Sequence, residues 1–173
     1  KGNSRAYRLG ELYARRGQVQ LQYLQDVDEA VLSYLKVIEL NPENDTAVKC
    51  LETIFSQQED WAQLISAYEK RAALISDDER RIEMLRRASR VAAAKLKEPA
   101  EAVRLYEAIL GVDSTDREAL DSLERYHERS RNWEDLISVL QNRLATASAG
   151  DAAIALLRRI AQICEEGLMS EDR

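Results

Sequence analysis

Apolar residues recur along most of the chain at intervals of three and four positions, which is the spacing of one face of an α-helix. In the stretch DEAVLSYLKVIEL, for example, Ala30, Tyr34 and Ile38 would lie on one side of a single helix. Asn, Asp and Ser residues that cap helices precede several such stretches. The pattern predicts nine helices, five over residues 4–25, 28–40, 45–58, 60–75 and 78–97 and four more that begin near residues 99, 116, 132 and 151.

The first predicted helix contains a feature that the others lack. Gly17 lies in its interior, where glycine weakens a helix, and this predicts an interruption near that residue. The apolar stripe of this helix includes Leu9, Leu12 and Leu24, which are therefore expected to face the core.

A long internal repeat runs through the chain without a gap, so that Trp61 returns as Trp133 and Arg71 returns as Arg143. Its period contains two pairs of helices, and we call it the double repeat. Short connectors make the two helices of each pair antiparallel, and alternate pairs have a first, or leading, helix that is about four residues longer. The second, or trailing, helices can be aligned on Ala30, Leu64, Ala102 and Leu136. The predicted hairpins span about 4–42, 44–76, 78–113 and 115–148, with an extra helix over 151–168.

These hairpins resemble the tetratricopeptide repeat, whose unit has about 34 residues. The resemblance implies an all-α fold, a right-handed α-solenoid of about nine helices formed by residues 1–173 as a single body. It also implies that the leading helices line a concave binding surface. The alternation of shorter and longer units resembles that of long bacterial arrays of this family. The matching residues of the first unit are Leu9, Gly10, Tyr13 and Gly17 in the leading helix and Ala30, Tyr34, Ile38 and Pro42 in the trailing helix.

The chain departs from the family pattern at two kinds of position. About eight more residues than usual separate Gly17 from Ala30, which predicts an extended or bulged first leading helix. Glu52 and Glu124 stand where the family prefers a small Gly or Ala, which predicts looser helix crossings there.

The ninth predicted helix aligns with the fifth and should open another unit, yet no trailing helix follows it. Its apolar face, which includes Ile154, Leu157 and Ile160, needs a cover. We expect that further repeats flank the chain in a longer parent protein; the alternative is that this helix is a terminal cap with a polar outer face.

Charge and composition restrict the classes of partner. The 25 basic and 31 acidic residues give a net charge of −6, which argues against non-specific nucleic-acid binding. No apolar run approaches the roughly 18 residues that a membrane span needs, so no membrane insertion is expected. The two cysteines, Cys50 and Cys164, are too far apart in sequence to suggest a disulfide framework, and a cytoplasmic location is expected.

The sequence offers few groups for catalysis. His127 is the only histidine, and a partly buried packing role is expected for it. The chain has no zinc-binding spacing of Cys and His and no glycine-rich phosphate loop. We therefore predict that the protein is not an enzyme and that it uses no metal and no cofactor.

Basic residues on the leading helices are the candidates for contact with a partner, which would then be an acidic peptide or protein surface. The alternative is that these residues form ion pairs with carboxylates of the same or neighbouring helices. The candidates are Lys49, Arg80, Arg87, Arg90 and Arg125.

The predicted function is that of a non-catalytic scaffold that binds a protein or peptide on the concave face of the solenoid. A different class of function is also open, a structural spacer in a larger protein with no partner of its own. RNA binding through the arginines of the fifth helix is a third hypothesis, and the acidic net charge ranks it last.

Overall fold

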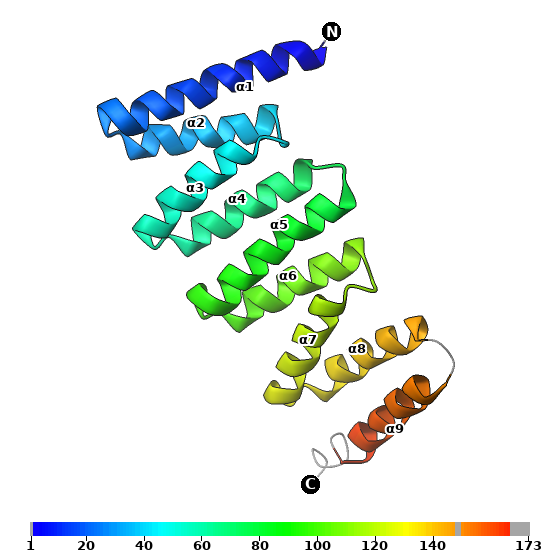
Figure 1. Ribbon diagram of the computed structural model, residues 1–173. Coiled ribbons are helices and arrows are strands. Elements are labelled where there is room, and N and C mark those ends of the chain that lie inside the picture. Colours follow the sequence, from blue (N-terminus) through cyan, green and yellow to red (C-terminus); the bar gives the residue numbers. More distant parts are fainter. Residues whose placement is uncertain (1, 148–149, 167–173) are drawn as a thin grey trace. The chain divides into compact units, whose positions relative to one another are not determined.

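The computed structural model describes residues 2–147 and 150–166, and almost all of them are helical (Figure 1). Two π-helical segments, η1 (Gln20–Leu24) and η2 (Ala92–Leu96), extend α1 and α5. The prediction of an all-α fold with nine helices is confirmed for the described part of the chain. The α-helices are α1 (Gly2–Val19), α2 (Val27–Leu40), α3 (Asp45–Gln58), α4 (Trp61–Leu74), α5 (Asp78–Val91), α6 (Pro99–Val112), α7 (Arg117–Ser130), α8 (Trp133–Thr146) and α9 (Asp151–Glu166).

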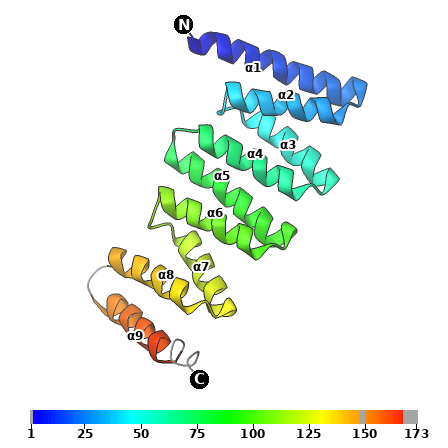
Figure 2. The same cartoon turned by 180° about the vertical axis from the view of Figure 1, so that it is seen from behind.

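The chain divides into two compact units, the first up to Glu98 and the second from Pro99 onward. In unit 1, α1 packs on α2, α2 on α3, α3 on α4 and α4 on α5. In unit 2, α6 packs on α7, α7 on α8 and α8 on α9. Within each unit, consecutive helices run antiparallel, and the view from behind in Figure 2 shows the same order. Each unit is therefore a stack of helix hairpins of the tetratricopeptide-like solenoid type.

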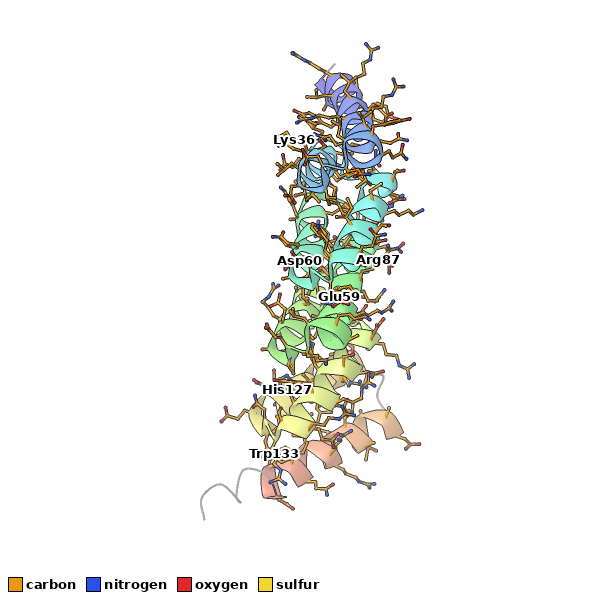
Figure 3. The ribbon with its side chains drawn as sticks, turned by 90° about the vertical axis from the view of Figure 1, so that its left-hand side faces the viewer. Lys36, Glu59, Asp60, Arg87, His127 and Trp133 are labelled. Atoms are coloured by element: carbon orange, nitrogen blue, oxygen red, sulfur yellow. The ribbon has the colours of Figure 1, made fainter. Side chains whose placement is uncertain are left out.

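Leading and trailing helices of unit 1 form two layers. Figure 3 shows α2 and α4 on the left of this unit and α3 and α5 on the right, with Lys36 and Arg87 labelled on the two sides. The stripes of apolar residues meet between the layers and form the core. The largest of the fully buried side chains in unit 1 include Ile38, Leu51 and Val37.

Acidic and amide side chains begin most of the helices. Asp26, Asn44, Asp60, Asp77 and Asp116 each accept a hydrogen bond from the backbone N–H three residues later. Such caps satisfy one of the backbone donors that a helix start leaves without a partner. These residues explain why the predicted starts of the helices agree closely with the observed ones.

The predicted interruption near Gly17 is wrong, because α1 continues through this residue as a regular α-helix. Glycine is needed there for a close approach: a Cβ atom at Gly17 would lie 3.0 Å from Cζ of Tyr34. The helix changes only at Gln20, where η1 begins, and the predicted extension or bulge of the first leading helix is confirmed. The buried Gln20 side-chain amide forms a hydrogen bond of 2.7 Å with Ser33 Oγ.

The two π segments occupy equivalent positions of the double repeat. Gln20 and Ala92, their first residues, are counterparts when the chain is aligned with itself. Gln25 and Lys97 end them, both in the left-handed conformation. The longer units thus differ from the shorter ones by a wider π turn at the end of the leading helix.

The apolar stripe predicted to be the inward face of α1 is in part wrong. Leu12 is 62 % exposed, and Leu9 and Leu24 are exposed as well. The face of α1 that is buried contains Gly10 and Gly17 instead. Helical periodicity identified a face with apolar residues, but glycines allow a different face of the helix to approach α2 more closely.

Candidate interaction surface

A groove lies between α1, η1 and α3 of unit 1, with a volume of about 390 Å³. Tyr34 of α2 lines it together with side chains of the two leading helices. Glu11, Arg15 and Gln18 come from α1, and Thr46 and Cys50 come from α3. We call this hollow the leading-helix groove.

The phenol of Tyr34 is buried at the edge of the groove. Burial of the ring and a hydrogen bond with Cys50 raise the pKa of Tyr34 well above its ordinary value. Tyr34 is therefore neutral over the physiological range, and its hydroxyl group serves as a hydrogen-bonding group rather than as a charge. Cys50 is a free thiol of intermediate exposure, as is Cys164 in unit 2.

A carboxylate of α3 is bound by a side chain from each of two other helices. Glu52 Oε1 accepts hydrogen bonds from Tyr68 Oη at 2.8 Å and from Arg87 Nη1 at 3.0 Å. Arg87 Nε also donates to Glu83 Oε1 at 3.0 Å. Hydrogen bonds from Arg87 to Glu83 and Glu52 raise the pKa of Arg87, whereas desolvation lowers it. Arg87 thus connects the leading helix α5 to the preceding leading helix α3.

Unit 2 contains the equivalent contact one double repeat later. Arg159 of α9 donates to Glu124 of α7. Arg159 Nη2 also lies 3.0 Å from Glu128 Oε1, and Arg143 Nε of α8 lies 3.1 Å from Glu124 Oε2. We call Glu52–Arg87 and Glu124–Arg159 the glutamate–arginine bridges. At the position where the family prefers Gly or Ala, this chain therefore has a carboxylate that binds an arginine of the next leading helix.

Residues 51–82 and 119–150 match the family model of the tetratricopeptide repeat. Each match starts within a leading helix, α3 or α7, and covers the following trailing helix, α4 or α8. These two hairpins are tetratricopeptide repeats. No curated protein matches the chain. The resemblance seen in the sequence is thus supported by the family comparison in the two shorter hairpins.

The two tetratricopeptide repeats anchor their trailing helices with equivalent arginines but different partners. Arg71 is 3 % exposed, and it donates from Nε to the Pro42 carbonyl at 2.8 Å and from Nη2 to Asp45 Oδ1 at 2.5 Å. In the second repeat Arg117 stands at the position of Asp45. Arg143 pairs there with Asp121, one helical turn further along.

The structure places the predicted partner-binding residues in different environments. Arg87 belongs to a glutamate–arginine bridge, and Arg80 pairs with Glu43. Arg125 of unit 2 donates from Nε to the carbonyl of Asp121 on its own helix at 3.0 Å. Lys49 on α3 and Arg90 on α5 are exposed. Surface pairing, the alternative considered for these residues, therefore describes Arg80 and Arg87, while binding by any of the five stays a prediction.

The bridges themselves were not predicted from the sequence. Glu52 and Glu124 were recognised only as departures from the family pattern. A stronger signal was present, because each glutamate has an arginine 35 residues later, and that spacing occurs in both copies of the double repeat. Such a pair is visible only once the double repeat is used as an alignment of the chain with itself.

In residues 2–147 and 150–166, no helix combines the length and the apolar character needed to cross a membrane. Among the same residues, no three or more His, Cys, Asp and Glu side chains are grouped so that they could hold a metal ion.

Proposed function

We propose that the protein is a non-catalytic scaffold and that its leading-helix groove binds an extended segment of a partner protein. Tetratricopeptide repeats generally mediate protein–protein interactions. The observation that carries the proposal is the groove itself, where the partly exposed Leu21 lies beside polar side chains of two leading helices. An extended peptide could bury apolar atoms against Leu21 and form hydrogen bonds with the polar rim.

Two cations favour an acidic segment as the ligand. Arg15 lines the groove on α1, and Lys49 is exposed on α3 next to the groove residue Cys50. In contrast to Arg80 and Arg87, neither needs to leave an observed intramolecular ion pair in order to contact a partner. Lys49 is therefore the strongest of the predicted binding residues.

The free thiols provide a test of this site. Peptides selected from a display library for binding to the protein should slow alkylation of Cys50 in the groove and leave Cys164 in α9 unaffected. Charge reversal by Lys49→Glu should weaken acidic peptides, whereas Arg129→Glu, an exposed charge reversal on α7, should not. Selected peptides that bind without protecting Cys50 would rule out the groove as the binding site.

We also propose that further tetratricopeptide-like repeats flank this chain. The exposed residues Leu12 and Tyr23 of α1 and η1 correspond, in the double repeat, to Met84 and Lys95 of the α5–η2 segment. In unit 1, Met84 is buried and lies 3.6 Å from Arg71 of α4, and Lys95 Nζ lies 5.3 Å from the centroid of the Trp61 ring. A trailing helix of the α4 type would cover α1 in the same way.

Fusion of a second copy of residues 41–76 in front of α1 tests the proposal of flanking repeats. The added hairpin should raise the midpoint of thermal unfolding and reduce binding of a hydrophobic dye. An equally long glycine–serine extension is the control, and equal effects of both would contradict the proposal. The structural-spacer alternative predicts this stabilisation too, but it predicts no peptide that protects Cys50. A cytoplasmic location and a bacterial origin stay predictions from the sequence.

A further inference from the structure

A second, smaller hollow lies in unit 2 between α6, α7 and α8, with a volume of about 130 Å³. Leu110, Leu123 and Val139 form its apolar part. We call it the His127 pocket. Its polar lining consists of Glu107, His127, Asp135, Ser138 and Asn142.

His127 is buried in this pocket without a complete set of hydrogen bonds. The residue is 4 % exposed, and its Nδ1 atom has no hydrogen-bond partner among the described residues. The nearest carboxylate oxygen, Oδ2 of Asp135, is 3.8 Å away and accepts instead from Asn132 Nδ2 at 2.5 Å. His127 is labelled in Figure 3, near the turn that leads to Trp133. A buried nitrogen without a partner is unfavourable, so this geometry points to a ligand that supplies the missing hydrogen bond.

The first tetratricopeptide repeat shows what the fold alone requires at this place. Phe55 is the equivalent of His127 in the preceding double repeat, and it is also 4 % exposed. Packing therefore needs only a buried ring, and an apolar ring satisfies it without a polar atom. The imidazole of His127 adds a hydrogen-bonding group that the packing does not require.

At three positions that line the pocket, the second repeat has a more negative or less positive residue than the first repeat. Leu35, Gln63 and Lys70 are the counterparts of Glu107, Asp135 and Asn142 when the chain is aligned with itself in the same frame. The first set carries one positive charge, whereas the second set carries two negative charges. These three exchanges lie at the pocket on α6 and α8, and they give the second repeat an acidic pocket.

We propose that the His127 pocket binds a cationic side chain, arginine or lysine, that a partner protein presents. A guanidinium or ammonium group has only donors, and the pocket offers acceptors: the carboxylates of Glu107 and Asp135 and, in its neutral form, Nδ1 of His127. The apolar residues at the pocket suit the aliphatic stem of such a side chain. A bound metal ion fits less well, because the described residues contain no group of three potential ligands. The site lies in unit 2 and does not depend on the leading-helix groove.

The only histidine of the chain provides a specific probe of this pocket. In NMR spectra of the protein labelled with ¹⁵N, the imidazole signals belong to His127 alone. Titration with the blocked peptide acetyl-Gly-Arg-Gly-amide should shift the Nδ1 signal in a saturable manner, with a dissociation constant in the millimolar range or below. The same peptide with glutamine in place of arginine is the neutral control and should cause no saturable shift.

Variants connect that shift to the proposed contacts. Glu107→Gln and Asp135→Asn should each weaken the arginine peptide about tenfold, through loss of a charge-assisted hydrogen bond. Glu134→Gln removes an exposed carboxylate on α8 outside the pocket and should leave the affinity unchanged. His127→Phe restores the residue of the first repeat, so it should fold and yet lose the peptide-induced shifts of the Ser138 and Asn142 amides.

Three results would overturn the proposal. The first is the absence of a saturable His127 shift with both the arginine and the corresponding lysine peptide. The second is an equal shift with the glutamine peptide. The third is full affinity for the arginine peptide in both Glu107→Gln and Asp135→Asn, because neither proposed carboxylate would then contribute to binding.

Discussion

Glu52 of α3 accepts a hydrogen bond of 3.0 Å from Arg87 of α5, a residue of the next leading helix. The same pair recurs in unit 2 as Glu124 and Arg159. Each bridge connects helices that are not neighbours in the sequence, with a trailing helix between them. The bridges therefore act on the spacing of leading helices, which is also the spacing of any surface that these helices form.

Loss of a bridge should destabilise unit 1 despite restoring the residue type that the family prefers. We expect Glu52→Ala to lower the free energy of unfolding by about 1 kcal/mol, because Arg87 and the Tyr68 hydroxyl both lose an acceptor. Urea unfolding of Glu52→Ala, Arg87→Gln and the double variant measures the coupling between the two side chains. Strictly additive effects would show that the observed contact contributes nothing to stability.

Replacement of the buried Arg71 should be costlier than replacement of its carboxylate partner. Arg71→Ala removes a buried side chain and leaves the Pro42 carbonyl without its donor, and we expect a loss of about 2–3 kcal/mol. Asp45 is 68 % exposed on its side chain, so Asp45→Asn should cost less than about 1 kcal/mol. Equal losses in the two variants, measured by urea unfolding, would contradict the buried anchor.

Two of the helical glycines, Gly17 and Gly111, should respond in opposite directions to alanine. At Gly17 the new Cβ would meet the Tyr34 ring at 3.0 Å, so we expect Gly17→Ala to destabilise by about 1–3 kcal/mol. At Gly111 no atom lies within 4 Å of the added Cβ, apart from the adjacent residues and the helix's own backbone. Gly111→Ala should therefore stabilise by up to about 1 kcal/mol through helix propensity. Thermal unfolding of both variants tests the pair, and stabilisation by Gly17→Ala would refute the close contact.

Acidification should remove the contribution of Glu39 to the stability of the fold over a defined range of pH. Hydrogen bonds and charges of Lys36 and Lys70 lower the pKa of Glu39 from 4.5 to about 2. Since the folded-state pKa is the lower one, the stabilisation is complete above about pH 4.5 and is lost as the pH falls toward 2.

The variant Glu39→Gln measures this contribution. It should lower the unfolding midpoint slightly at neutral pH, by no more than about 3 °C, since the pairs are exposed and screened by salt. The difference from the unmodified protein should diminish below about pH 4. A difference that is independent of pH would show that loss of the charge is not its cause.

Helix positions were predictable here because side chains at the helix starts determine them. Asp60 and Asp77 cap their helices by local hydrogen bonds, and such contacts depend on residues three apart in the sequence. The helix ends at Glu59 and Arg131 adopt the left-handed conformation without being glycine. No residue type in the sequence indicates that conformation there.

The candidate site was less predictable than the fold. Periodicity placed Arg80 and Arg87 on one face of a helix, but it could not show that Glu43 and Glu52 lie opposite them. The same limit explains Leu12, since an apolar stripe indicates a surface suited to burial without indicating which element covers it. Contacts between side chains that are distant in the sequence depend on how the helices pack. In the sequence of this chain, such contacts are indicated only by the internal repeat.

The π segments η1 and η2 indicate how the double repeat arose. A π turn holds an additional residue within a continuous helix, and such a feature is unlike the regular helix ends of α3 and α7. Its presence at equivalent positions of the double repeat is explained most simply if it already existed in one ancestral pair of hairpins. A short and a long hairpin would then have been duplicated together, as one gene segment.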